Sequence, residues 1–278
     1  MKQRTITPAW QKSLDEWRAA LVAAGRTPQT IETRLEHMRR MARQTGAPSP
    51  ALLSRSRLIE WAGAHAWARE TRRSMYATIK AFYRWALESG TVNDDISDTL
   101  PRVRAAAPAP RPADESAYRA ALAAASARTH VILRLAGEAG LRRAEIAQIS
   151  TNDLYRDLMG WSLRVHGKGE KVRAVPLTES LAREVRGVLA DSASGWLLPS
   201  ERGGHLSPRW VGKLASRVLP APYTLHTLRH RFATSVYSTT SDLLTVQRLL
   251  GHASVATTQR YVAIDAGRLR SAVAAAAV

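Results

Sequence analysis

Apolar residues recur at three- and four-residue steps through the first hundred residues, which is the spacing of helices with one buried face. The segments that share this pattern cover about residues 10–21, 28–42, 54–67 and 70–87. Thr27 and Pro28 are typical of a helix N-cap and first helical residue. Gly25, Gly46 and Gly90 follow helix ends. Four helices with short connections indicate a small helical bundle.

The second half mixes helical spacing with one stretch of alternation. Helices are predicted over about residues 113–127, 130–139, 141–146, 178–190, 207–219, 225–236 and 243–250. Trp161, Leu163 and Val165 alternate with polar residues, the segment 167–171 is a turn, and the segment 172–177 returns as a second strand. With a further strand near residues 152–155, this predicts a small antiparallel sheet. The expected fold is therefore mainly α with a small sheet, an α+β class.

Prolines mark the boundary between the two halves. Pro101, Pro108, Pro110 and Pro112 interrupt a basic segment, and proline stiffens a chain and blocks helix. We expect a helical domain over residues 1–108, a linker over about 94–112, and a second domain over 113–278.

Charge changes the picture toward a polyanionic partner. The 278 residues include 41 Lys and Arg against 23 Asp and Glu, a net charge of +18, and the excess is +8 in residues 1–110 and +10 in the remainder. Neutralising phosphates is the simplest use of such an excess, so double-stranded DNA is the expected partner. A basic protein from a GC-rich genome is the alternative.

Several classes of protein are excluded by composition. The chain has no cysteine, which excludes disulfides and Cys-ligated zinc. It has no apolar run of about 18 residues, so no membrane span is expected, and its first residues lack the apolar core of a signal peptide. We expect a cytoplasmic protein. No ATP-binding motif and no metal-ligand spacing occur, so neither a cofactor nor a metal is expected.

A basic stripe runs along the predicted fourth helix. Its members recur at steps of three and four residues: Arg69, Arg73, Tyr76, Lys80 and Arg84. A positive helix face with one aromatic residue suits contact with DNA. A solvated helix face is the plain alternative.

The segment 223–261 carries the candidate chemistry. His226 and Arg229 lie beside the buried face of the predicted helix 225–236. His252 directly follows Gly251, which ends the next helix, and a last short segment ends in Tyr261. Arg, His and Tyr grouped in this way suggest a site that holds a phosphate and attacks it with a phenol.

This segment resembles the second conserved box of the tyrosine recombinases, or phage integrase family. The matching residues are His226-Thr227-Leu228-Arg229-His230, Ala233-Thr234, Leu249-Leu250-Gly251-His252 and Thr257-Thr258-Gln259-Arg260-Tyr261. Gly140-Leu141-Arg142-Arg143-Ala144-Glu145 resembles the first box of the family. The segment 167–177 is similar to the family's lysine hairpin, GKGxKxRxVPL. Several independent pieces agree in order, which makes the resemblance specific.

The resemblance implies a core-type DNA-binding domain over residues 1–108, a catalytic domain over residues 113–278, and a role for each matching residue. Arg142 and Arg229 would bind the phosphate, with Glu145 supporting Arg142. Lys168 would protonate the leaving 5′ oxygen, and Lys171 is the alternative. His226 is the candidate base, His252 the candidate donor to the phosphate, and Tyr261 the nucleophile that forms a 3′-phosphotyrosine.

The family also implies a biological setting. A site-specific recombinase of the integrase type is expected, compact like the Xer proteins and lacking an arm-binding domain, which assembles as a tetramer on DNA near the nucleoid of a bacterial or phage-infected cell. An accessory directionality factor stays open as a further partner. Viral genome integration, dimer resolution and cassette movement also stay open. The alternatives are a type IB topoisomerase-like activity and a non-catalytic DNA-binding regulator.

Overall fold

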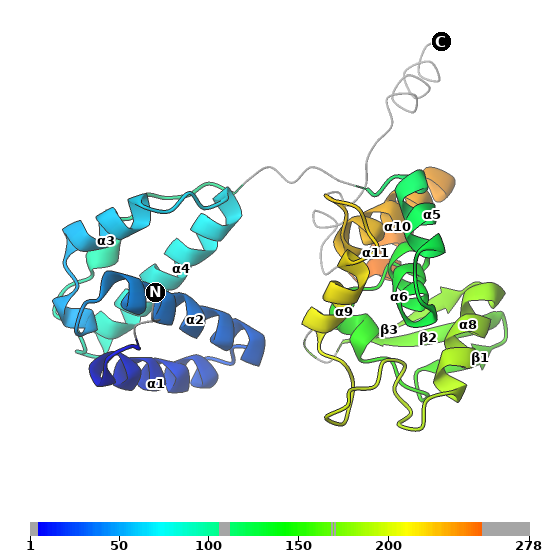
Figure 1. The fold of residues 1–278 in the computed structure, drawn as a ribbon, viewed down its shortest axis with the longest axis horizontal. Helices are drawn as coiled ribbons and strands as arrows, with labels where there is room; N and C mark the ends of the chain where they lie inside the picture. The colour runs from blue at the N-terminus through cyan, green and yellow to red at the C-terminus, as the bar shows by residue number, and fades with distance from the viewer. Residues whose placement is uncertain (1–4, 106–111, 168, 170, 252–278) are drawn as a thin grey trace, which may run out of the picture. The chain divides into compact units, whose positions relative to one another are not determined.

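The computed structural model describes residues 5–105, 112–167, 169 and 171–251. The chain divides into two compact units, residues 1–107 and 108–278. Helices dominate both units, and the second also contains a three-stranded antiparallel sheet (Figure 1). The expected α+β fold class is confirmed. None of the helices in the described ranges has both the length and the apolar composition needed to cross a bilayer.

In the described part of the first unit, residues 5–105, the chain forms four α-helices and two short 3-10 helices. These are α1 Pro8–Ala23, α2 Pro28–Thr45, η1 Pro50–Leu52, α3 Arg55–Gly63, α4 Arg69–Glu88 and η2 Ile96–Thr99. The local sequence explains where the helices begin. The Thr7 hydroxyl accepts a hydrogen bond from the Trp10 backbone N–H at 3.3 Å, and Pro28 is the first residue of α2.

An aromatic cluster forms the core of this unit. Trp10, Trp17 and Phe82 are buried, and the Trp17 ring meets the Phe82 ring edge-on with centroids 5.2 Å apart. The Trp10 indole N–H donates to the Ala47 carbonyl at 2.9 Å, so its polar atom is satisfied inside the core. These rings join α1 to α4 and give the bundle a single packed interior.

The third helix is shorter than predicted. The sequence predicts a helix over residues 54–67, but α3 ends at Gly63. Beyond it, the His65 ring stacks on the Trp67 ring with centroids 4.5 Å apart, and Trp67 meets Trp61 edge-on at 5.1 Å. The chain therefore leaves the helix and folds these rings against its last turn.

The basic stripe on α4 differs from the prediction at Tyr76. That side chain is only 7% exposed, and its ring lies edge-on to Trp67 with centroids 6.4 Å apart. Tyr76 belongs to the core because the apolar face of α4 is wide enough to include it, so it was wrongly assigned to the DNA-binding face. The other members of the stripe have exposed or half-exposed side chains: Arg69, Arg73, Lys80 and Arg84.

The predicted linker begins too early. Ile96 and Leu100 were placed in it, yet both are buried in the core of the first unit. Arg55 on α3 holds the same segment through ion pairs with Asp94, at 2.8 Å, and with Asp98. The segment 94–100 is therefore part of the first unit.

The second unit is larger and mixes helices with the sheet. Its elements are α5 Glu115–Ala123, α6 Ala127–Glu138, α7 Arg143–Ala147, β1 Leu154–Asp157, β2 Gly160–His166, β3 Val172–Leu177, α8 Glu179–Ala190, α9 Pro208–Ser216, α10 Leu225–Thr240 and α11 Leu243–Leu250. The predicted helix over residues 113–127 begins at Glu115 and ends at Ala123, and Ser126 is the N-cap residue of the separate helix α6.

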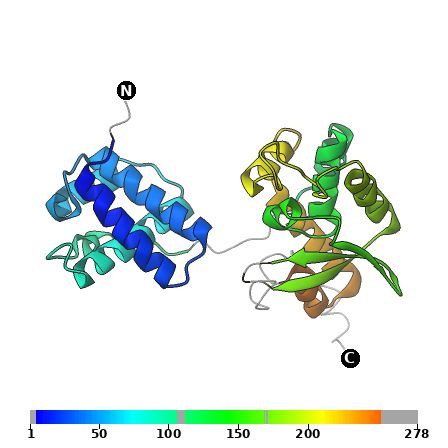
Figure 2. The same ribbon diagram turned by 90° about the horizontal axis from the view of Figure 1, so that it is seen from below.

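The predicted antiparallel sheet is confirmed, with strand order β1-β2-β3. In the β2–β3 hairpin, Val165 pairs with Arg173 and His166 with Val172. The Gly167 N–H donates to the Lys171 carbonyl at 2.7 Å and closes the turn. Helix α8 packs against β2, and α11 contacts β3 (Figure 2).

Helix α6 lies at the centre of this unit. Val131, Ile132, Leu133, Leu135 and Ala136 on it are all fully buried, and α10 packs along it. This packing brings the start of α10 beside the loop that follows α6.

Gly140 lies in that loop, and its φ of +66° is a conformation that glycine adopts without strain. A Cβ at Gly140 would collide with the Phe232 ring on α10. The close approach between the loop and α10 therefore depends on glycine at this position.

Candidate active site

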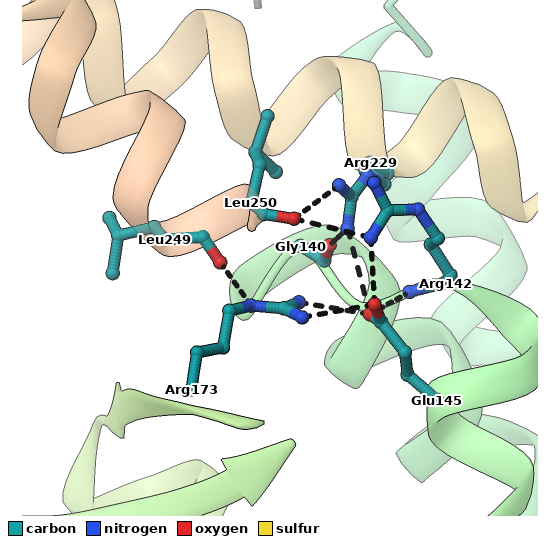
Figure 3. A network of polar contacts seen from close by, with 7 residues as sticks. All are labelled: Gly140, Arg142, Glu145, Arg173, Arg229, Leu249 and Leu250. Atoms are coloured by element: carbon teal, nitrogen blue, oxygen red, sulfur yellow. Dashed lines mark hydrogen bonds and ion pairs between the residues drawn. The ribbon is translucent and has the colours of Figure 1, made fainter. Parts of the chain in front are cut away.

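Seven residues were predicted for the active site, and the structure describes four of them and brings these four together. Arg142 and Glu145 lie at the start of α7, and His226 and Arg229 lie in the first turns of α10. Figure 3 shows Arg142 and Arg229 beside the carboxylate of Glu145. The other three predicted residues lie outside the described residues: Lys168, His252 and Tyr261.

Arg142 is the residue directly before α7, and Glu145 binds it twice. The Arg142 backbone N–H donates to Glu145 Oε2 at 2.8 Å, and its Nη1 donates to Glu145 Oε1 at 2.7 Å. The Glu145 side chain is 3% exposed, whereas the Arg142 side chain is 39% exposed. This is a buried anchor for a partly exposed guanidinium, unlike a surface ion pair, which contributes little.

Arg229 lies in the interior of the site. Its side chain is 1% exposed, and it donates from Nη2 to the Leu250 carbonyl at 2.6 Å and from Nη1 to the Gly140 carbonyl. Its Nη1 also lies 3.7 Å from a Glu145 carboxylate oxygen. A capping box between Thr224 and its N3 residue fixes the start of α10 and hence the direction of this side chain.

Arg173 is a member of the site to which sequence reasoning gave no role. From β3 it donates through Nη1 and Nη2 to the two Glu145 oxygens, at 3.0 and 2.9 Å, and through Nε to the Leu249 carbonyl at 2.8 Å. Its side chain is 14% exposed. Arg173 is the arginine of the lysine-hairpin motif, so the motif could have singled it out in the sequence. Its partners are distant in the sequence, and no local spacing indicated its role.

Glu145 is thus the common partner of three arginines (Figure 3). Burial alone raises the pKa of Glu145. The hydrogen bonds and charge of Arg173, the Arg142 N–H and the charge of Arg229 outweigh burial and lower this pKa below its usual value. Glu145 is therefore ionised at neutral pH and holds the arginine cluster in place.

The carboxyl end of α11 completes the cluster. The Leu250 carbonyl accepts from Arg229 and, at 3.3 Å, from Arg142, while the Leu249 carbonyl accepts from Arg173. Terminal helix carbonyls lack intrahelical donors and carry partial negative charge, so cations are favoured there. These bonds fix the end of α11 at the position from which the chain continues to His252.

A cleft of about 1100 Å³ opens at this cluster. Arg142, His226 and Arg229 line it together with residues of α9. On α9, Trp210 is 41% exposed, and the Lys213 ammonium lies 4.7 Å from its ring centroid. The cleft is therefore lined by basic side chains and an aromatic ring, which is suitable for a phosphate-bearing ligand.

His226 lies within this cleft, beside the two arginines. Desolvation lowers the pKa of His226, and the charges of Arg229 and Arg142 lower it further. The imidazole is therefore neutral at pH 7, which is the form that accepts a proton. Its ring meets that of His230 edge-on, with centroids 4.7 Å apart.

The remaining predicted contacts lie on the first unit. Arg69, Arg73 and Arg84 are exposed on α4, and Arg73 Nε donates to Glu70 at 2.9 Å. Their exposure is compatible both with DNA contact and with a solvated face. Across the described ranges, no group of three or more His, Asp or Glu side chains is arranged to hold a metal ion.

Comparison with known proteins connects this site to a family. Residues 113–268 match the model of the phage integrase family. The chain is 34% identical over 227 residues to the tyrosine recombinase XerC of Rhodospirillum centenum, which covers 72% of the chain and 64% of that relative. It is 33% identical over 222 residues to the tyrosine recombinase XerD of Caulobacter vibrioides, which covers 72% of each.

Solved structures show the same fold. A lambda integrase dimer bound to a COC′ core site matches with a TM-score of 0.71 and 16% identity, over 93% of this chain and 78% of that one. The XerH recombinase bound to a palindromic difH substrate matches with a TM-score of 0.65 and 20% identity, over 87% and 78%. The chain therefore belongs to the phage integrase family, the family of tyrosine recombinases.

Proposed function

We propose that this chain cleaves and rejoins DNA at specific sites, with Tyr261 forming a covalent 3′-phosphotyrosine intermediate. The observation that carries the proposal is the cleft in which Arg142, His226 and Arg229 meet. These three residues lie on two separate elements, and the buried carboxylate of Glu145 holds the arginines in fixed positions.

The arginines suit the charge that develops on the phosphate. A phosphodiester repels nucleophiles because it is anionic, and more charge accumulates on its oxygens in the transition state. Guanidinium groups held in place beforehand stabilise that charge without reorganising during the reaction. In this proposal Arg142 donates from the wall of the cleft, and Arg229 forms its floor.

Proton transfers accompany the exchange of bonds. The Tyr261 oxygen attacks phosphorus while the bond from phosphorus to the 5′ oxygen breaks. His226 accepts the phenol proton, for which its lowered pKa is suited, and Lys168 donates a proton to the leaving 5′ oxygen. His252 donates a hydrogen bond to the phosphate. The phosphotyrosine conserves the energy of the broken bond, so a 5′-hydroxyl can reseal the strand without ATP.

The partner in this proposal is double-stranded DNA. Both halves of the chain carry a positive excess, +8 and +10, so both can neutralise phosphates. In the first unit, Arg69, Arg73, Lys80 and Arg84 are the proposed DNA contacts. We also propose that the protein works as a tetramer on DNA in the nucleoid of a bacterial or phage-infected cell, with a directionality factor as a further partner.

A nicked duplex tests the chemistry directly. The target is first isolated by selecting random-sequence DNA for binding to the full chain. A nick then lets the short 5′-hydroxyl fragment diffuse away, so the protein should remain linked to a 3′-phosphate, and mass spectrometry should identify Tyr261 as the linked residue.

The Tyr261→Phe variant keeps the ring and should bind the same duplex without forming an adduct. A 5′ linkage, or an adduct that persists in this variant, would overturn the mechanism. Tight binding by the wild type without any adduct would favour a non-catalytic DNA-binding protein.

A further inference from the structure

We propose that Arg173 is a positioning residue, which fastens the β2–β3 hairpin to Glu145 and to the end of α11 and thereby directs Lys168 toward the leaving group. The inference rests on the proposed function. It assigns a role in the reaction to a side chain that acts through other residues.

Arg173 lies close to the turn of the β2–β3 hairpin. It pairs with Val165 at the base of the turn, and the turn closes through the Gly167–Lys171 hydrogen bond at 2.7 Å. Lys168 follows Gly167 directly in the sequence. Any change in how the hairpin base sits against the rest of the unit is therefore transmitted to the turn that carries Lys168.

The Arg173 side chain links β3 to α7 and to α11. Its two terminal nitrogens bind Glu145 on α7, and its Nε binds the Leu249 carbonyl of α11 (Figure 3). One planar side chain thus connects three elements. A lysine at this position would keep the charge but lose the fork that spans both oxygens of the carboxylate.

Arg173 lies outside the lining of the cleft. It is absent from the residues that line the cleft, whereas Arg142 and Arg229 are present among them. In Figure 3 it reaches the Glu145 carboxylate from a different side than Arg142 and Arg229 do. Arg173 therefore acts on the reaction through Glu145 and the hairpin and not through contact with a bound phosphate.

Arg173 also contributes to the charge of the arginine cluster around Glu145. Three guanidinium groups and one carboxylate give this cluster a net charge of about +2 by simple formal counting. Without Arg173, Glu145 would be balanced only by the two arginines that line the cleft, and their charge would be less available to a phosphate. Arg173 therefore also keeps Arg142 and Arg229 effective as phosphate ligands.

The experiment compares two DNA substrates that differ only in the leaving group, each cleaved by the same set of protein variants. The selected, nicked duplex is made once with the natural 5′-bridging oxygen and once with sulfur, whose thiolate departs without a proton. Rates of adduct formation are measured for the wild type, Arg173→Gln and Arg173→Lys. The matched control is Arg164→Gln, which changes an exposed arginine on β2 in the register position next to Arg173.

We expect Arg173→Gln to slow cleavage of oxygen-bridged DNA about 100-fold, as a displacement of about 1 Å in a catalytic group does. The sulfur-bridged duplex should be slowed less than about tenfold, because it does not need the proton from Lys168. Arg173→Lys should shift the oxygen-to-sulfur ratio in the same direction by a smaller factor. Arg164→Gln should leave both rates unchanged.

The ratio of the rates on oxygen-bridged and sulfur-bridged DNA distinguishes a misplaced Lys168 from a loss of folded protein, because an inactive fraction of the protein lowers both rates equally. Equal slowing of the two substrates, or an unchanged rate on oxygen-bridged DNA, would overturn the positioning of Lys168 by Arg173 while leaving the proposed function intact. Failure of the wild type to form any adduct on its selected site would instead refute the proposed function, and this inference with it.

Discussion

Replacing Glu145 with glutamine tests whether the arginine cluster depends on one buried charge. Glutamine keeps the size of the side chain and one acceptor oxygen, but it removes the charge and presents an NH₂ group to arginine donors. In the structure the carboxylate accepts from Arg142 at 2.7 Å and from Arg173 at 2.9 and 3.0 Å, with Arg229 at 3.7 Å. The variant therefore leaves buried cations without their anion.

The expected loss is large for a single substitution. Removing one partner of a buried ion pair costs about 3–5 kcal/mol, and the retained shape of glutamine places this variant near about 3 kcal/mol. For a unit of this size, that corresponds to a fall in Tm of about 6–12 °C. The exposed Glu201 provides the control, since Glu201→Gln should change the free energy of unfolding by less than about 0.5 kcal/mol.

The pH dependence of this loss follows from the lowered pKa of Glu145. Its contribution is fully present above the pKa of the unfolded carboxyl, about 4.3, and is lost as the pH falls through the lower pKa of the folded state. The difference between the wild type and Glu145→Gln should therefore be constant from about pH 7 to pH 5 and shrink below about pH 4.

Urea unfolding of the full chain measures these free energies, and peptide-level hydrogen exchange assigns the transition to residues 113–251. A difference below about 1 kcal/mol at pH 7 would contradict the assignment of Glu145 as the buried partner of three arginines. A difference of the same size at every pH would show that the lost charge is not the cause.

Two further predictions concern DNA. Because the pKa of His226 is lowered, its neutral form should persist to below about pH 6.5. The rate of adduct formation should therefore fall only below that pH, and His226→Gln should remove this pH-dependent fall in the rate. A midpoint of the pH–rate profile above about pH 6.5 would exclude His226 as the base. Binding to the selected duplex should weaken about 10³-fold or more between 50 and 200 mM salt if six or more phosphates are contacted, as measured by fluorescence anisotropy; a flat response would exclude DNA binding by phosphate neutralisation.

Local patterns in the sequence were sufficient for most helix starts and for the hairpin. Thr27 and Pro28 predicted the start of α2, and the helix predicted from residue 207 has Ser207 as its N-cap, whose hydroxyl accepts from the Trp210 N–H at 3.2 Å. Alternating apolar residues predicted β2 and its return strand. These features depend on contacts within a few residues, so short segments contain the information needed to predict them.

The same patterns were insufficient where packing between elements decides burial. The steps of three and four residues placed Tyr76 with the arginines of α4, but the Trp67 ring, folded back from the end of α3, covers it. Ile96 and Leu100 were placed in the linker because prolines and arginines follow them closely in the sequence, yet the bundle buries both. A segment's own residues do not determine what packs over it.

The candidate site shows the same division. The spacing of Arg142 and Glu145, and of His226 and Arg229, was visible in the sequence because each pair lies within one helical turn. The cluster itself is assembled over long separations: Arg173 reaches Glu145 across 28 residues, Arg229 reaches Gly140 across 89, and Arg142 reaches Leu250 across 108. The docking of α11 against α10 and β3 brings two helix-end carbonyls beside the carboxylate that three arginines share. That docking is a property of the packed core, because no local spacing specifies which distant backbone carbonyls a guanidinium will meet.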